Sequence, residues 1–258
     1  MDGTGLRLER EGSVARLVLA RPDKQNAISR AMWRALLDHA TELAADPTVR
    51  AVIVTGAPPV FSAGADIAEF AHVFQDEGAA QAYNELVQAA MAAIERLPVP
   101  VIAEIRGSCI GGGCGLALAC DLRFAATDAR LGITPARLGL AYSLGDVKRL
   151  MDLVGPARAK DILFSARLLD AEEAGAIGLV DRVLPPEELS QGVAAYVQGL
   201  TTLSGSSQRL IKQIVRLVLS GQVEEDAASR ALRDGAVAHA DFAEGKSAFL
   251  AKRRPRFA

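Results

Sequence analysis

A run of three glycines constrains the fold of this chain more than any other feature. Gly111, Gly112 and Gly113 lie within GSCIGGGCGLALACD, residues 107–121, between the apolar runs VIAEI and DLRFAAT. The sequence therefore predicts a strand, a glycine loop, a helix and a second strand, an order of elements that is typical of an α/β protein. Because adjacent glycines are costly to order, we infer that the main chain itself is used where this helix begins.

The start of that helix exposes main-chain N–H groups. These groups have no partner inside the helix, and the helix dipole adds positive charge there, so Gly112 can donate to an anion or a developing oxyanion. The loop FSAGAD, residues 61–66, offers a second accessible donor because Ala63, Gly64 and Ala65 are small. Two donors on one oxygen form an oxyanion hole, although close packing also explains a glycine run. No GK[ST] or GxGxxG nucleotide motif accompanies the glycines.

The remaining pattern predicts two regions. A hairpin over LRLER and VARLVLARP opens a core of strands and helices, in which Ser29 caps the first helix. The sequence pattern predicts a helix around residues 156–164, then a short strand in GLVDRVL, and only helices from there to the end of the chain. We therefore expect an α/β core over residues 1–185 and a helical region over residues 186–258. The apolar faces of the last helices need a surface to pack on, either the core or another subunit.

Composition excludes several classes of function. With a formal net charge of -2, the chain has no basic field for nucleic acid or an anionic membrane. The apolar runs are too interrupted to span a bilayer, so we expect a cytoplasmic protein with no membrane partner. Cys109, Cys114 and Cys120 lack matched partners elsewhere, which indicates reduced core residues and no metal site. The basic KRRPRF near the C-terminus is either a solvated tail or a contact for a phosphorylated ligand.

Five segments in order resemble the crotonase superfamily, also called the enoyl-CoA hydratase/isomerase family. They are RPDKQNAIS, FSAGADIAEF, PVPVIAEIRGSCIGGGCGLALACDLRFAA, AEEAGAIGLVDRVLP and GKSAFLAKRRPRF, which together extend over nearly the whole chain. The resemblance implies an α/β fold of the crotonase (ClpP-like) type, a spiral of ββα units. It also implies a C-terminal helical trimerisation region, and hence a homotrimer or a dimer of trimers.

The same resemblance implies a site for an acyl-CoA substrate. The N–H groups of Ala65 and Gly112 would polarise the thioester carbonyl and stabilise its enolate. Coenzyme A is then the substrate's carrier, and no separate cofactor is implied. Lys24 would lie near the CoA phosphates, and two C-terminal residues would reach the nucleotide across a subunit boundary. The residues expected to bind substrate are Lys24, Ala27, Ala63, Gly64, Asp66, Ile67, Ile110, Gly111, Pro135, Phe249 and Lys252.

Both acid–base positions of the family's hydratases differ here. Hydratases carry one glutamate directly after GGGC and another in a later PE…LG segment, and these positions are Gly115 and Pro135 in this chain. Hydration needs a base for the water and an acid for the α-carbon, each worth about 10² to 10⁴-fold. Neither residue supplies such a group. Asp66 is either a relocated acid or a residue that orders its loop.

The segment TPARLGLAYSL resembles the methylmalonyl-CoA decarboxylase branch, which has a tyrosine in its active site. Tyr142 falls at that position, and Ser143 falls where other branches place a reaction-specific carboxylate. Loss of CO2 from a malonyl-type thioester forms the enolate without removal of a C–H proton, and a nearby carboxylate would repel the substrate's own. We therefore expect an acyl-CoA lyase or isomerase, with decarboxylation first, in which the catalytic residues are Ala65, Gly112, Tyr142 and Ser143.

Three alternatives stay open. The first is that the chain is a hydratase or isomerase with relocated acid–base groups, and the second is that it is a noncatalytic acyl-CoA-binding protein. Tyr142 also has a purely structural interpretation, in which its hydroxyl bonds to the main chain.

Overall fold

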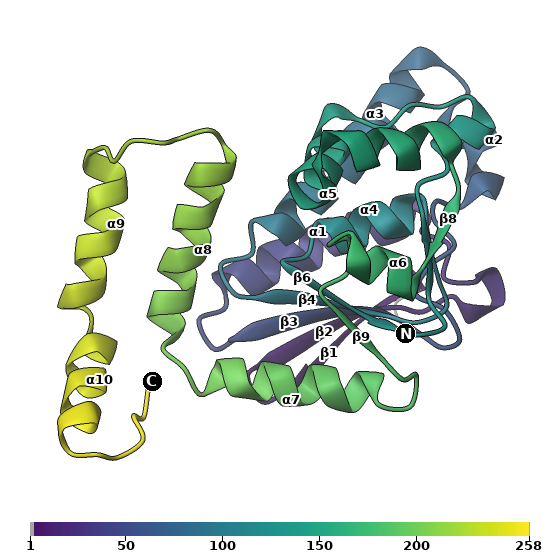
Figure 1. Cartoon of the computed structure of the whole chain (residues 1–258). Helices are drawn as coiled ribbons and strands as arrows, with labels where there is room; N and C mark the ends of the chain where they lie inside the picture. Colours follow the sequence, from purple (N-terminus) through teal and green to yellow (C-terminus); the bar gives the residue numbers. More distant parts are fainter. Residues whose placement is uncertain (1–2, 258) are drawn as a thin grey trace.

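The computed structural model describes residues 3–257 and has a central sheet covered by helices on both faces (Figure 1). The first two strands are antiparallel and the others are parallel. In spatial order the sheet contains β1 (Leu6–Glu11), β2 (Val14–Leu19), β3 (Ala51–Gly56), β4 (Val101–Ile105), β6 (Leu122–Ala126) and β9 (Arg182–Leu184). A smaller sheet contains β5 (Ser108–Ile110), β7 (Arg130–Gly132) and β8 (Leu168–Asp170).

The inner strands β3 and β4 are buried on both faces, as the apolar sequence of β3 predicts. Val52 and Val54 of β3 pack in the larger core, whereas Ala51 and Ile53 face the opposite side. Helices α1 (Arg30–Ala45), α3 (Glu77–Glu95) and α4 (Gly112–Leu118) contribute to the larger core. Helix α7 (Leu189–Thr201) covers the other face, as Figure 1 shows. This alternation follows from the period of two along a strand.

Local signals place most of the early elements as the sequence predicts. The hairpin forms with Leu6 opposite Leu19, and the Ser29 hydroxyl accepts from the Met32 N–H at 3.2 Å to cap α1. Asp76 caps α3 in the same way, so this helix begins at Glu77, slightly earlier than the apolar pattern indicates. The short helices are η1 (Pro22–Lys24), η2 (Ile67–Glu69), α2 (Phe70–Val73), η3 (Pro135–Leu138) and α6 (Ala171–Ala176).

Helix α5 (Leu144–Ser165) contains the helix predicted around residues 156–164, but the sequence analysis missed the part before it. It begins at Leu144 rather than near Pro156, because Ser143 caps it by accepting from the Asp146 N–H at 3.1 Å. Gly155, at a φ of 75°, interrupts the helix just before Pro156. The glycine and proline therefore mark a kink inside α5, and the predicted helical segment is the part that follows the kink. The short strands β5, β7 and β8 were not expected either.

The last three helices form an arm beside the core: α8 (Gly205–Leu219), α9 (Ala227–Ala238) and α10 (Ala240–Leu250) (Figure 1). Several apolar side chains on this arm are exposed, including Ile211, Val218, Phe249 and Leu250. Helix α7 belongs to the core in its packing, so only α8 to α10 stand apart. Within residues 3–257, no helix has the length and apolar character needed to cross a membrane.

Candidate active site

Two main-chain N–H groups border one cavity of about 320 Å³. A Cβ atom added to Gly112 would lie 3.5 Å from the nitrogen of Ala65, so the two peptide groups are close neighbours. Neither N–H has a main-chain acceptor within residues 3–257. Two unpaired donors beside one cavity are the components of an oxyanion hole.

The three glycines of the triplet meet three different needs. Gly111 adopts a φ of 52°, in the left-handed region that favours glycine. Gly112 leaves open the approach to the Ala65 N–H. Gly113 is needed for packing, because a Cβ there would lie 2.6 Å from the Cβ of Ser62. The triplet therefore combines close packing with an accessible main chain, where the sequence left these as alternatives.

The loop that carries Ala65 is held by bonds on both sides. Gly64 accepts from the Ile28 N–H at 2.7 Å, and the Asp66 N–H donates to the Ile28 carbonyl at 3.0 Å. The Asp66 carboxylate pairs with Arg21 at 2.8 Å and accepts from the Ala68 N–H at 3.2 Å. It is not among the residues that line the cavity. Asp66 thus orders the loop, which was the second of its two interpretations.

The Gly112 N–H belongs to the peptide group that joins Gly111 to Gly112, and hydrogen bonds to the Gly111 carbonyl hold that group. The Gly111 N–H donates to the Gly132 carbonyl at 2.8 Å. The Gly111 carbonyl accepts from the Gly115 N–H at 3.0 Å and from the Tyr142 hydroxyl at 2.6 Å. Tyr142 lines the cavity, yet its proton is directed to the main chain.

The rest of the cavity wall is mostly apolar. Aromatic and aliphatic side chains from α1, α2 and α3 and from the segment before α5 form it: Trp33, Phe70, Phe74, Val87, Met91, Leu138 and Leu140. Burial raises the pKa of Tyr83 to about 12, and the nearby Trp33 indole opposes this only in part. A wall of this kind suits an acyl chain, with few polar groups to orient the reacting end.

One carboxylate lines this cavity within the described part of the chain, and it belongs to Asp146. Asp146 lies in the first turn of α5 and is 5% exposed. Its Oδ2 accepts from the Ser143 hydroxyl at 2.7 Å and from the Gln88 amide at 3.0 Å, and its Oδ1 accepts from Arg149 at 3.1 Å. Three donors from two helices therefore fix the direction of the carboxylate.

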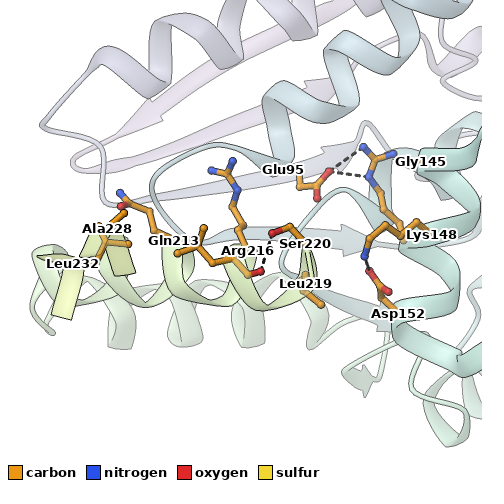
Figure 2. Close-up of a pocket in the computed structure, with 12 residues that line it drawn as sticks. Glu95, Gly145, Lys148, Asp152, Gln213, Arg216, Leu219, Ser220, Ala228 and Leu232 are labelled. Carbon is orange, nitrogen blue, oxygen red and sulfur yellow. Dashed lines mark hydrogen bonds and ion pairs between the residues drawn. The ribbon is translucent and has the colours of Figure 1, made fainter. Parts of the chain in front are cut away.

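A larger cavity of about 660 Å³ lies between α5 and the arm (Figure 2). Its charged residues include two ion pairs, Glu95 with Arg149 at 2.9 Å and Lys148 with Asp152 at 2.5 Å. Figure 2 shows Gln213 and Arg216 of α8 on the opposite side. We assign the candidate site to the smaller cavity, because that cavity has the two free donors, the apolar wall and the fixed carboxylate.

Comparisons with known proteins show the family of the chain. The enoyl-CoA hydratase/isomerase family matches residues 9–258. The chain belongs to this family. The crotonyl-CoA hydratase of Syntrophomonas wolfei is 35% identical over 252 residues, which are 97% of this chain and 96% of that protein. The human mitochondrial Delta(3,5)-Delta(2,4)-dienoyl-CoA isomerase is 36% identical over 186 residues, 68% of this chain and 57% of that protein.

Solved structures of the family give the same result for the fold. An enoyl-CoA hydratase/carnithine racemase from Magnetospirillum magneticum superposes with a TM-score of 0.94 at 35% identity, over 100% of this chain and 96% of that one. The expected crotonase fold is therefore confirmed, and the chain is an acyl-CoA enzyme of the enoyl-CoA hydratase/isomerase family.

Within this family, the position of Asp146 explains how a carboxylate reaches the site. Gly115 is the position at which the family resemblance predicts a glutamate in hydratases, and a Cβ there would lie 3.7 Å from the Asp146 Oδ1. The Asp146 carboxylate thus lies next to the space that the missing side chain would enter. Sequence analysis missed it, because in this part of the chain it predicted helix only around residues 156–164. A serine followed three residues later by an acidic residue is a helix-start signal that could have revealed it.

The structure brings nine of the predicted site residues to the cavity and leaves six outside it. Those that line it are Ala63, Gly64, Ala65, Ile67, Gly111, Gly112, Pro135, Tyr142 and Ser143. Those that do not are Lys24, Ala27, Asp66, Ile110, Phe249 and Lys252. Lys24 is exposed on η1, and Phe249 is 83% exposed on the arm. The C-terminal pair therefore has no contact with the cavity of its own chain.

Proposed function

We propose that this enzyme moves a proton between carbon atoms of an acyl-CoA thioester, as in the shift of a double bond. Ala65 and Gly112 donate to the thioester oxygen and stabilise the enolate, and Asp146 is the base. The observation that supports this is a single fixed carboxylate on the same cavity as two free N–H donors. One base can remove a proton from one carbon and return it to another. No cofactor beyond the CoA of the substrate is needed.

Hydration fits this site less well than isomerisation. It requires one group to activate water and another to deliver a proton to the α-carbon. Asp146 supplies one carboxylate, and Pro135, the position of the family's second glutamate, supplies none. One base and an oxyanion hole supply all the groups that isomerisation needs, whereas hydration needs a second acid–base group.

Decarboxylation of a malonyl-type thioester is the second candidate. It is favoured by Gly115 and Pro135, which leave both hydratase positions without a carboxylate. Two contacts weigh against it. The Tyr142 hydroxyl donates to Gly111 and so has no proton for a substrate carboxylate. Asp146 would also face that carboxylate as a like charge, at a cost of up to about 4 kcal/mol at a separation of about 4 Å near a protein surface.

A panel of thioesters distinguishes these reactions. We expect the enzyme to convert 3-enoyl-CoA to 2-enoyl-CoA, and to exchange the α-protons of butyryl-CoA in deuterated water. Malonyl-CoA and methylmalonyl-CoA should release little CO2. Asp146→Asn should slow isomerisation and exchange by about 10² to 10⁴-fold, the usual contribution of a general base.

The matched control is Asp152→Asn on the same helix. Asp152 pairs with Lys148 and lies outside the candidate cavity, so its replacement should leave both rates near those of the wild type. Rapid CO2 release from malonyl-type substrates, unaffected by Asp146→Asn, would refute the isomerase proposal in favour of decarboxylation. Binding of every thioester without turnover of any would favour a noncatalytic protein.

We also propose that the chain assembles through its arm, as a trimer or a dimer of trimers. The support is the exposure of Ile211, Val218, Phe249 and Leu250 on α8 and α10, since apolar side chains on unpartnered helices favour association. Assembly would also let the Phe249 and Lys252 region contact CoA bound to another subunit. Analytical ultracentrifugation tests this, and a monomer at micromolar concentration would contradict it.

A further inference from the structure

We propose that Tyr142 is a positioning residue for the oxyanion hole, acting through the peptide group that joins Gly111 to Gly112. Its hydroxyl donates to the Gly111 carbonyl at 2.6 Å. That carbonyl and the Gly112 N–H belong to the same peptide group. This role rests on the oxyanion hole of the proposed function, but it does not depend on which base or which acyl group the enzyme uses.

The peptide plane carries the effect from one end to the other. A peptide group is planar and its C=O and N–H point in opposite directions, so fixing the oxygen fixes the direction of the N–H. A hydrogen bond to the oxygen also polarises the group and makes the N–H a stronger donor. The Tyr142 hydroxyl, on one side of the peptide, therefore orients and strengthens the Gly112 donor on the other.

The second donor is held by the same device. The Ala65 N–H shares its peptide group with the Gly64 carbonyl, which accepts from the Ile28 N–H at 2.7 Å. Both oxyanion peptides are thus gripped at their carbonyl ends. The Gly64 carbonyl accepts from a main-chain N–H, so no side-chain substitution removes that hydrogen bond. The Gly111 carbonyl accepts one of its hydrogen bonds from the Tyr142 side chain, so a substitution of Tyr142 can test the role of that bond.

The surroundings keep Tyr142 in this role. Burial raises the pKa of the Tyr142 hydroxyl well above its usual range, so the group remains a proton donor. The ring packs against the larger core beside the cavity. Ser143 and Asp146 follow in the same segment, so the bond to Gly111 also ties the carboxylate's helix to the oxyanion loop.

Removal of the hydroxyl should perturb this peptide without unfolding the protein. In Tyr142→Phe the Gly111 carbonyl still accepts from the Gly115 N–H at 3.0 Å, so no buried carbonyl is left unpaired. The remaining bond holds the oxygen from one direction only. We expect a folded protein whose Gly112 donor is weaker and less well oriented.

The experiment measures polarisation of a bound thioester that does not react further. Butyryl-CoA labelled with carbon-13 at the thioester carbonyl is bound to the enzyme, and the carbonyl band is isolated by isotope-difference infrared spectroscopy. In the wild type we expect the band below its position in free butyryl-CoA. In Tyr142→Phe the displacement should be smaller, and α-proton exchange in deuterated water should slow by about 10 to 100-fold, with little change in the affinity for butyryl-CoA.

A tyrosine remote from the cavity supplies the matched control. Tyr196 packs on Phe124, with ring centroids 5.1 Å apart, on the opposite face of the sheet. Tyr196→Phe controls for the general effect of removing a phenol hydroxyl from this protein.

Each outcome has one meaning. A wild-type band at the position of the free thioester would refute the oxyanion hole, and with it the proposed function. A displaced band in the wild type that is unchanged in Tyr142→Phe would overturn the positioning role alone. A loss confined to malonyl-CoA, with butyryl-CoA unaffected, would overturn it too, because Tyr142 would then contact the substrate carboxylate directly.

Discussion

Introduction of a glutamate at Gly115 should destabilise this protein. The built Cβ at this position lies 2.9 Å from the Cε of Met91 and 3.7 Å from the Asp146 Oδ1. The first contact is with the end of a flexible side chain, which can move. The second is with a fixed carboxylate, and a glutamate would bring a like charge beside it.

The two effects have different sizes. An added side chain in a packed core costs about 1–3 kcal/mol, and replacing a glycine inside a helix recovers up to about 1 kcal/mol. Two carboxylates about 4 Å apart repel by up to about 4 kcal/mol at an effective dielectric constant near 20. We therefore expect Gly115→Gln to cost about 1–2 kcal/mol and Gly115→Glu about 2–4 kcal/mol more at neutral pH.

Chemical denaturation of four proteins measures this charge term. The set is the wild type, Gly115→Gln, Gly115→Glu, and Gly115→Glu combined with Asp146→Asn, which should recover most of the difference between the glutamate and glutamine variants. The difference should also shrink at acidic pH, since a proton on either carboxyl removes the repulsion. Equal stability of Gly115→Glu and Gly115→Gln at pH 7 would refute the placement of Asp146 beside this position.

Two further results are expected. Gly112→Pro removes one oxyanion donor at a helix position that tolerates proline, so turnover should fall about 10² to 10³-fold in a folded protein, and unchanged turnover would contradict the oxyanion hole. Burial raises the pKa of Glu104, but bonds from Ser190 and Arg16 and the nearby Arg106 outweigh it and hold the pKa below its usual value. Glu104→Gln should therefore cost about 1–3 kcal/mol at pH 7, and urea titrations should show this difference shrinking as pH falls below the ordinary carboxyl range.

The positions of the two N–H donors beside one cavity were predictable from sequence because each donor depends on local sequence. A glycine triplet before a short apolar helix and a loop of small residues each expose main chain by their own composition, whatever the rest of the fold does. The family resemblance then paired Ala65 with Gly112 across the chain. The same locality made Ser29, the first hairpin and β3 predictable, since caps and alternating apolar residues act over a few positions.

The carboxylate was not predictable, because its position depends on three segments distant in sequence. Asp146 borders the cavity because α5 begins at Leu144, because Gln88 of α3 and Arg149 of α5 hold its oxygens, and because Gly115 leaves space beside it. None of these conditions is visible in the neighbourhood of one motif. Its detection from sequence would have required the Ser143 cap to outweigh the loop-like composition of the segment.

If the proposed function holds, the reaction of this family member is determined by residues 142–146, at the start of α5. Within a few residues this segment supplies a hydroxyl that grips one oxyanion peptide, a serine that caps the helix and bonds the carboxylate, and the carboxylate itself. The donors of the hole are main-chain atoms, so they can persist while side chains change. A difference in reaction between this chain and its hydratase relatives then needs no change in the fold. It needs only that the carboxylate enter from α5 instead of α4, on the same side of the cavity.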